Sequence, residues 1–504
     1  VSDELARRSA EACGTAAEVL DAQSLMAADR GLLDAVGERV RAGDPAPWAV
    51  TEAVAGFQSR LAAAGGYFAE RAADLADVAN RAVADLLGLP LPGLPESDEP
   101  YVLVAVDLAP ADTANLDRAK VLAIVTERGG PTSHTAILAK AAGLPAVVNC
   151  PAAAGITSGQ RLVVDADDGR VLVDPDPAEA EKVLAAHRSR VAAQAAVSGA
   201  GRTADGYPVK LLLNLGEPDG ITAAGAVDAE GVGLFRTEFL FLDRAGAPTL
   251  SEQERIYREL FAAFDGRTVI VRTLDAGSDK PLGFVQHRDE PNPALGIRGY
   301  RVSVAEPDLL DTQLAAIAAA AQNSGAHVRV MAPMVSTAAE AAEFAARVHG
   351  HGLASAGVMI EVPAAALRAG RVLAEVEFGS IGTNDLSQYT FAADRGLADL
   401  AELLDPWQPA LLDLIGRTAR AGQELGRPVG VCGEAAADPM LAPVLVGLGV
   451  TSLSMAPAAV PAVRAALREN TLDGCRELAD LALHSAGPAQ ARDAVRRRRG
   501  GQSM

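Results

Sequence analysis

Charged side chains and one thiol stand at the ends of short apolar runs in the second half of the sequence. "GVGLFR" and "TVIVRT" carry arginines near their ends, "GVMIEV" carries a glutamate and "VGVCGE" a cysteine. Carboxylates are hard oxygen ligands of the kind that Mg²⁺ prefers, and guanidinium groups bind phosphate and carboxylate. This combination predicts a site for a divalent cation together with an anion that has several oxygens. The residues of the predicted site are Arg236, Arg272, Glu361, Asn384, Asp385, Arg395 and Cys432.

Each of these residues also has an ordinary structural interpretation. A single arginine or carboxylate at a strand end more often forms a surface ion pair than binds a ligand. Cys432 could be a small core residue, and Asn384 and Asp385 could cap a helix. Their occurrence together, at the ends of successive apolar runs, favours a site.

A separate candidate is His134, which lies in "GGPTSHTAILAKAAG" at 129–143. The apolar pattern after Ser133 predicts a helix, whose first turn has unpaired backbone N–H groups, and the glycines before it let an anion approach. The positive end of a helix favours a neutral imidazole and then stabilises a phosphoryl group attached to it. A nucleophilic histidine is one interpretation. A half-buried histidine in a helix capped by Thr132 or Ser133 is the other.

Eight short apolar runs between residues 207 and about 470 are expected to position the first group of residues. Each is followed by a helical or helix-containing segment. Eight alternating strand and helix units are typical of a (β/α)8 TIM barrel, whose working face is the carboxyl end of the strands. The runs are "VKLLLN", "GVGLFR", "TVIVRT", "VRVMAP", "GVMIEV", "FGSIGT", "VGVCGE" and "TSLSMA".

The sequence before the barrel has two different patterns. Residues 1 to about 88 have apolar positions at helical spacing throughout, and the proline-rich "LPLPGLPESDEP" then acts as a connector. From 101 to about 177, short apolar runs surround the helix after Ser133 and end in a predicted hairpin with "DADDG" as its turn. A Gly/Ala/Ser-rich stretch up to 206 is expected to be a hinge. The basic end "ARDAVRRRRGGQSM" is expected to be frayed.

Composition narrows the functional classes. A formal net charge of −20 argues against a general nucleic-acid binder, because phosphate neutralisation needs a basic face. The four cysteines form no CxxC pair, which argues against a structural zinc site and fits a reducing compartment. No apolar run approaches the roughly 20 residues that span a bilayer, and the start has no signal-peptide pattern. We therefore expect a cytoplasmic protein without membrane insertion.

The string "GGPTSHTAILAK" resembles the phosphohistidine signature of the phosphoenolpyruvate (PEP)-utilising enzymes. The segments "GVGLFRTEFLFLDR", "VRTLDAGSDKPL", "NPALGIRGYR", "IGTNDLSQYTFAADR" and "GVCGEAA" are similar to that family's barrel motifs, in the same order. Within the family the resemblance is greatest to the PEP-protein phosphotransferases, Enzyme I of the sugar phosphotransferase system. It covers nearly the whole chain. It implies a helical domain at 1–92 that binds the phosphocarrier protein HPr, a swivelling α/β phosphohistidine domain at 93–185, a linker at 186–206, a PEP-binding TIM barrel at 207–485 and a basic tail at 486–504.

The resemblance also implies a role for each candidate residue. PEP would phosphorylate His134, which would pass the phosphoryl group to HPr. Glu361 and Asp385 would bind Mg²⁺, and Cys432 would protonate the enolate carbon as pyruvate forms. Arg298 would be a second-tier phosphate ligand, and a homodimer through the barrel is expected. The substrate would be held by Arg236, Arg272, Asn384, Asp385 and Arg395.

Three features depart from the family pattern. Lys140 stands where the family has arginine, and lysine lacks the planar guanidinium fork of arginine. Ser278 replaces a glycine in a substrate loop. The sequence starts directly with helix instead of a strand that completes the histidine domain, and we expect either a misassigned start or a real truncation. One alternative is therefore a catalytically impaired regulatory paralogue. Another is a relative of pyruvate phosphate dikinase or PEP synthase, although no Gly-rich nucleotide loop precedes the histidine domain.

Overall fold

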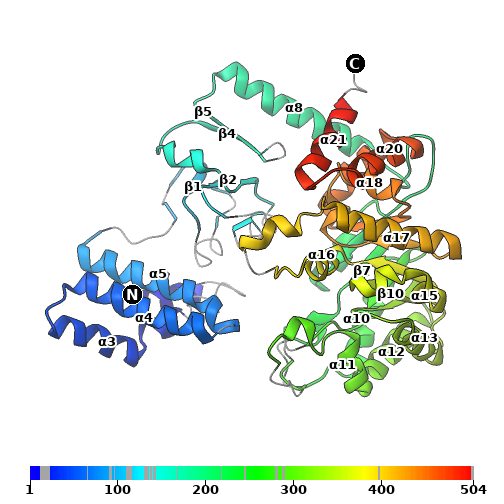
Figure 1. The fold of residues 1–504 in the computed structure, drawn as a ribbon, viewed down its shortest axis with the longest axis horizontal. Helices are drawn as coiled ribbons and strands as arrows, with labels where there is room; N and C mark the ends of the chain where they lie inside the picture. The colour runs from blue at the N-terminus through cyan, green and yellow to red at the C-terminus, as the bar shows by residue number, and fades with distance from the viewer. Residues whose placement is uncertain are drawn as a thin grey trace. The chain divides into compact units, whose positions relative to one another are not determined.

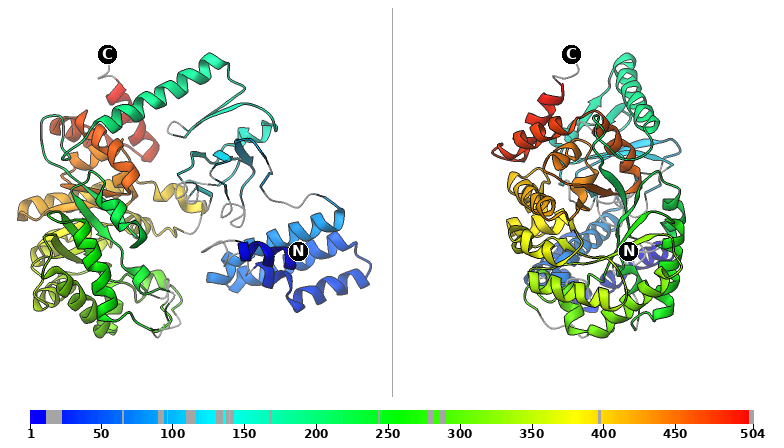
Figure 2. Two further views of the ribbon diagram at one scale, coloured as in Figure 1. Left: turned by 180° about the vertical axis from the view of Figure 1, so that it is seen from behind. Right: turned by 90° about the vertical axis from the view of Figure 1, so that its right-hand side faces the viewer.

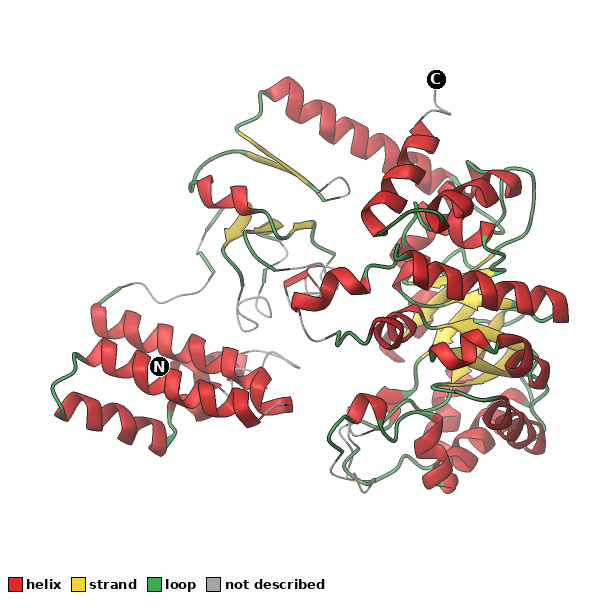
Figure 3. Ribbon diagram, in the orientation of Figure 1, coloured by secondary structure: helices red, strands yellow, loops and turns green. Residues whose placement is uncertain are grey.

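The computed structural model describes residues 1–11, 23–64, 66–89, 94–95, 97–108, 116–117, 119–129, 135–136, 139, 143–166, 169–216, 218–242, 244, 246–277, 282–285, 290–395 and 398–500. His134, Lys140 and Ser278 therefore lie outside the described residues. The chain divides into two compact units, Val1–Ala185 and Ala186–Met504. Figure 3 shows where helices and strands occur along them.

The first part of unit 1 is helical, as the sequence predicts. Its helices pack through apolar faces, and Leu32, Val54 and Leu75 are buried between them. The side chain of Asp29 accepts a hydrogen bond from the Leu32 N–H and so caps one helix at its start. These helices are α1 (Ser2–Glu11), α3 (Arg30–Arg41), α4 (Ala46–Ala64) and α5 (Gly66–Leu87), labelled in Figure 1.

The second part of unit 1 holds the small α/β fold. Parallel strands β1 (Tyr101–Ala105), β2 (Val121–Thr126) and β3 (Ala146–Val147) form one sheet in that order. Strands β4 (Leu162–Asp165) and β5 (Arg170–Val173) pair antiparallel, which confirms the predicted hairpin. A short helical turn, η1 (Pro151–Gly155), lies between the two sheets in sequence.

Little of the helix predicted after Ser133 falls within the described residues. Thr135, Ala136 and Ala139 are helical. Thr135 is buried, and its hydroxyl donates a 3.3 Å hydrogen bond to Asp107. Ala139 packs with Leu103 in the core of this part of the chain.

Helix α8 (Pro177–Ala196) crosses the boundary between the two units. It therefore occupies the first half of the linker predicted at 186–206. The irregular part of that segment starts after Ala196.

Unit 2 contains a closed barrel of eight parallel strands, which confirms the TIM-barrel prediction (Figure 2). The last strand pairs with the first and closes the barrel, for example at Leu453 and Leu211. All eight predicted runs are strands. They are β6 (Lys210–Leu215), β7 (Gly231–Phe235), β8 (Thr268–Arg272), β9 (His327–Ala332), β10 (Ala356–Ile360), β11 (Phe378–Ile381), β12 (Val429–Val431) and β13 (Ser452–Met455).

Helices cover the outside of the barrel, and the main hydrophobic core lies between them and the strands. Capping boxes begin two of the helices, with Thr249 and Glu252 at α10 and Thr337 and Glu340 at α13. The helices are α9 (Ile221–Gly225), α10 (Leu250–Ala263), α11 (Tyr300–Ala305), α12 (Pro307–Ala321), α13 (Ala338–Gly350), α14 (Pro363–Leu367), α15 (Ala369–Val372), α16 (Thr383–Phe391), α17 (Pro409–Leu425), α18 (Ala442–Gly447), α19 (Val460–Arg468) and α20 (Leu472–Leu483). Short helical turns are η2 (Pro218–Gly220), η3 (Glu238–Leu240), η4 (Pro293–Leu295), η5 (Leu373–Glu375), η6 (Ala398–Leu404), η7 (Glu434–Ala437) and η8 (Pro457–Ala459).

A second, smaller apolar cluster fills the middle of the barrel. It consists of side chains from six strands or strand ends, because alternate residues of each strand point inward. We call it the barrel plug. Its members are Leu234, Ile270, Met331, Met359, Phe378 and Cys432.

The prediction that the basic end of the chain is frayed is wrong for most of that segment. Residues Pro488–Gly500 form helix α21, and its Ala491 and Val495 are fully buried. Arg498 pairs with Glu477 of α20 at 2.7 Å. These two apolar residues are four positions apart among the arginines, and this spacing gives the helix one buried face.

No helix in the described parts of the chain is long and apolar enough to cross a membrane.

Candidate active site

A cavity of about 550 Å³ opens at the carboxyl end of the barrel strands. It contains every barrel residue of the predicted site, although these residues come from five different strand ends. This convergence follows from the parallel barrel, because all eight strands end at the same face. The lining residues are Gly216, Leu234, Arg236, Glu238, Phe239, Leu242, Arg272, Asp275, Met359, Glu361, Gly382, Asn384, Asp385, Arg395, Cys432 and Gly433.

Local structure explains how the polar side chains reach the cavity. Arg272 is the last residue of β8, whereas Arg236, Glu361 and Cys432 each follow a strand by one residue. Asn384 and Asp385 lie in the first turn of α16, which starts two residues after β11. Each side chain therefore lies at the mouth end of the barrel, and that of Cys432 is also part of the barrel plug.

Carboxylates hold Arg272 in place. Its Nη2 donates a 2.6 Å hydrogen bond to Glu238, and its Nη1 lies 3.4 Å from Asp275. Burial would lower the pKa of Arg272, but Glu238, Asp275 and Glu361 raise it above its usual value, so the guanidinium stays charged. Its Nε is buried without a hydrogen-bond partner. Arg272 thus keeps one unused donor beside the cavity.

Glu361 is fully buried, and only one of its two carboxylate oxygens has a hydrogen-bond partner. Its Oε1 accepts a 2.6 Å hydrogen bond from the Met334 N–H, whereas its Oε2 has no hydrogen-bond partner. Burial, together with the negative charges of Asp385 and Asp275, raises the pKa of Glu361 to about 8. A cation beside this carboxylate would favour its charged form and so oppose that shift.

Asp385 is the second carboxylate, and two arginines face it. Its Oδ1 lies 3.0 Å from Nη1 of Arg298 and 3.5 Å from Nη2 of Arg395, but no hydrogen bond reaches that oxygen. Arg395 is partly exposed and is also held by Gln388 at 3.1 Å. It can therefore approach a ligand in the cavity without losing its own support.

Arg298, the expected second-tier phosphate ligand, lies behind the cavity wall, and its role as a ligand stays a prediction. Its side chain is 1% exposed and does not line the cavity. It donates two 3.1 Å hydrogen bonds to the two oxygens of Asp275, and a third hydrogen bond goes to Tyr389. Arg298 consequently holds Asp275 and Asp385 in position from behind the cavity.

Asn384 and Cys432 complete the wall. The Asn384 side-chain oxygen accepts a hydrogen bond from the Glu434 N–H at 3.1 Å, which leaves its amide group for the cavity. The Cys432 thiol lies 3.5 Å from the carbonyl of Ile381 and is almost completely buried. Burial raises the pKa of Cys432 to about 11, so the sulfur carries its proton at neutral pH.

Sequence reasoning missed two further carboxylates of the site. Glu238 and Asp275 line the cavity and orient Arg272, and the Asp275 N–H also bonds to Glu238 at 3.2 Å. Both residues lie in the segments "RTEF" and "LDAG", directly after predicted strands. Their place at strand ends was the available signal.

Two buried carboxylate oxygens without hydrogen bonds, one on Glu361 and one on Asp385, fit a hard divalent cation. In the described part of the chain no set of three or more His, Cys, Asp and Glu residues could enclose a metal ion. Mg²⁺ suits two carboxylates nevertheless, because it keeps several waters and takes further oxygens from phosphate-bearing substrates.

Three parts of one known protein family match this chain, and together they cover almost its full length. The PEP-utilising enzyme, PEP-binding domain matches residues 191–472, the mobile domain of the same family matches 97–169, and its N-terminal domain matches 1–71. The order of these matches is the order of the helical, small α/β and barrel parts described above.

Three curated proteins illustrate the similarity, and each is called phosphoenolpyruvate-protein phosphotransferase. That of Streptomyces coelicolor is 53% identical over 98% of this chain and 89% of its own length. That of Haloferax volcanii is 40% identical over 96% and 87%, and that of Bacillus subtilis is 36% identical over 87% and 80%.

Proposed function

Because the chain belongs to the PEP-utilising enzymes, and within them to the phosphoenolpyruvate-protein phosphotransferases, we propose that it transfers a phosphoryl group from PEP to His134. The phosphohistidine would then phosphorylate HPr, and pyruvate would be released. This is the first step of sugar uptake by the phosphotransferase system. The supporting observation is the gathering of three arginines, four carboxylates and one thiol around a single cavity.

The arginines account for substrate binding. PEP carries a phosphate and a carboxylate, and Arg236, Arg272 and Arg395 offer guanidinium groups to both. Glu238 and Asp275 already hold the guanidinium of Arg272 beside the cavity, so binding costs little reorganisation. Phosphoryl transfer depends mainly on such positioning and on positive charge around the moving group.

Glu361 and Asp385 would hold Mg²⁺, on which PEP-utilising enzymes generally depend. When bound, the ion would neutralise charge on the phosphoryl oxygens. It would also separate two carboxylates that repel each other. Glu361 presents its unpartnered oxygen for this purpose, while Met334 fixes the other.

Cys432 is the proposed proton donor. As the phosphorus–oxygen bond of PEP breaks and the bond to the His134 imidazole forms, the leaving group is the enolate of pyruvate. Its carbon takes the proton from the Cys432 sulfur, and the resulting thiolate regains a proton from solvent. The raised pKa of Cys432 supports this role, because an acid must be protonated before it can donate.

The same proposal covers the partners. The helical segment at 1–92 would dock HPr, and the barrel would form a homodimer. Both assignments rest on family membership and on the resemblance of the helical segment.

Incubation with labelled PEP and Mg²⁺, without nucleotide, tests the function. We expect acid-labile label on His134 that passes to added HPr. A requirement for ATP or AMP would point instead to a dikinase relative. Absence of label would indicate an inert paralogue.

A further inference from the structure

A second cavity lies at the opposite, amino-terminal end of the barrel. Its volume is about 270 Å³, and its walls include residues of seven strands, β6 to β9 and β11 to β13, most of them at or near the strand starts. Ile270 and Phe378 of the barrel plug line it, whereas Leu234, Met359 and Cys432 of the same cluster line the active-site cavity. The plug therefore separates the two cavities.

This cavity is unusual for the interior of a barrel. Bulky aliphatic side chains normally fill the inward positions of each layer. Here the inward positions at the strand starts carry two cations and several hydroxyl groups. The polar side chains are Lys210 on β6, Thr268 on β8, Arg329 on β9, Ser380 on β11, and Ser452 and Ser454 on β13.

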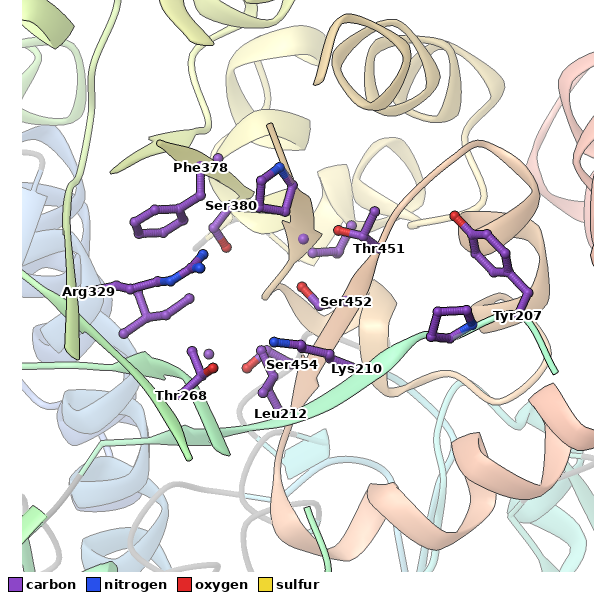
Figure 4. Close-up of a pocket in the computed structure, with 17 residues that line it drawn as sticks. Tyr207, Lys210, Leu212, Thr268, Arg329, Phe378, Ser380, Thr451, Ser452 and Ser454 are labelled. Carbon is purple, nitrogen blue, oxygen red and sulfur yellow. The ribbon is translucent and has the colours of Figure 1, made fainter. Parts of the chain in front are cut away.

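The polar groups converge on one space. In Figure 4 the guanidinium of Arg329, the ammonium group of Lys210 and the hydroxyls of Ser380 and Ser452 point toward the centre of the cavity. Gly430 keeps the wall open beside Ser452, because a Cβ on this glycine would collide with the Ser452 hydroxyl. The space around the Ser452 hydroxyl thus depends on the absence of a side chain at Gly430.

Arg329 provides the main argument for a ligand. It is half-buried, and its guanidinium lies 5.4 Å from the centre of the Phe378 ring. No ion pair joins it to a carboxylate among the residues that the structure describes, and burial lowers the pKa of Arg329 despite the negative charge of Glu377. A partly desolvated cation without an ion-pair partner is unfavourable, and an anion in the cavity would offset that cost.

From this arrangement we infer that the amino-terminal cavity of the barrel binds a small tetrahedral oxyanion of the size of phosphate. Arg329 and Lys210 supply positive charge from two sides. The hydroxyls of Ser452, Thr268 and Ser380 can donate hydrogen bonds from others. Donors around all sides suit a tetrahedral group better than a planar carboxylate.

The cavity is also connected to the active site through hydrogen bonds. The Ser454 hydroxyl donates to the Asn214 side-chain oxygen at 2.6 Å, and the Asn214 amide donates to the Cys432 carbonyl at 2.8 Å. Turnover would therefore be an ambiguous readout for this site. Binding is the quantity to measure.

Calorimetric titration of the full chain with inorganic phosphate tests the inference. The Arg236→Gln background weakens phosphate binding at the active-site cavity, so that the second site dominates. In this background Arg329→Gln should weaken phosphate binding about tenfold or more, because it removes a charge-assisted hydrogen bond. Lys210→Gln should weaken it several-fold, and this exposed position tolerates substitution. Arg258→Gln, on the exposed surface of α10, is the matched control and should change nothing.

Three outcomes would overturn the inference. The first is unchanged phosphate affinity in both the Arg329 and the Lys210 variant. The second is acetate binding as tightly as phosphate, which would reject a tetrahedral ligand. The third is a crystal soaked with tungstate that shows no anomalous signal between Arg329 and Ser452. None of these results depends on transfer to His134, so failure here is distinguishable from failure of the proposed function.

Discussion

Glu361 accepts a 2.6 Å hydrogen bond from the backbone N–H of Met334, and this bond fixes one carboxylate oxygen, while the other, called here the open oxygen, is buried without a hydrogen-bond partner. Met334 has a positive φ of 58°, a conformation that costs a non-glycine residue energy. The strained backbone aims its N–H at the carboxylate. The open oxygen lies next to Gly382, where a Cβ would come within 2.8 Å of it.

Gly382→Ala should therefore block metal binding at Glu361. The added methyl group would occupy the space beside the open oxygen, and φ at this position is negative, so alanine adds no backbone strain. In the presence of PEP, added Mg²⁺ should raise the melting temperature of the protein. We expect the Gly382→Ala variant to need at least tenfold more Mg²⁺ for the same rise. Gly370→Ala is the control, because a Cβ there meets nothing within 4 Å. Equal Mg²⁺ dependence in both variants would contradict the assignment of Glu361.

Cys432→Ala should slow pyruvate formation about 100-fold or more, since a positioned general acid contributes at least that much. PEP affinity, measured by equilibrium binding, should change only a few-fold. Cys475→Ala is a matched control, because Cys475 is also buried but lies on α20. Normal turnover of the Cys432 variant would exclude the thiol as proton donor.

The raised pKa of Cys432 also predicts a pH dependence of stability. Its ordinary value of 9.0 applies to the unfolded chain, and the folded value is about 11. Between these values the unfolded chain loses the proton first and binds fewer protons, so the free energy of unfolding falls as pH rises. Cys432→Ser cannot titrate there and should show a smaller fall, by about 2–3 kcal/mol at most. Urea titrations at pH 8 and pH 11 measure the free energy of unfolding of both proteins. An equal fall in that free energy between the two pH values would refute the prediction.

Arg298→Gln should destabilise the barrel strongly. The change leaves Asp275 buried and short of its bidentate partner, and loss of one member of a buried ion pair costs about 3–5 kcal/mol. Arg258→Gln removes an exposed pair on α10 and should cost about 1 kcal/mol or less. Chemical denaturation of both variants provides the comparison. A small effect of the Arg298 change would mean that Asp275 is neutral or otherwise supported.

Val495→Ala should cost about 2 kcal/mol, because it removes buried methyl groups from α21. Arg496→Ala, at an adjacent position that is 58% exposed, should change stability by less than about 0.5 kcal/mol. The same denaturation assay applies. If both variants were equally stable, the end of the chain would be frayed in solution.

The order of the parts and the face that carries the site follow from local sequence patterns. Eight buried runs with helices between them allow few folds other than a closed parallel barrel, and strand direction then places every strand end at one mouth. Arg272, Glu361 and Cys432 could therefore be assigned to one cavity before any coordinates existed. The local sequence pattern is sufficient to place such residues, because their position along a strand determines how far along the barrel axis they lie.

The pairing of charged groups, in contrast, depends on how distant segments fold together. Arg298 and Asp385 are 87 residues apart and meet because η4 and the residues after it lie beside α16, so Arg298 faces two carboxylates instead of the cavity. The buried face of α21 and the polar cavity around Arg329 are likewise consequences of what packs against them. Pairing and burial depend on distances between segments that are far apart in sequence, and no local pattern contains those distances.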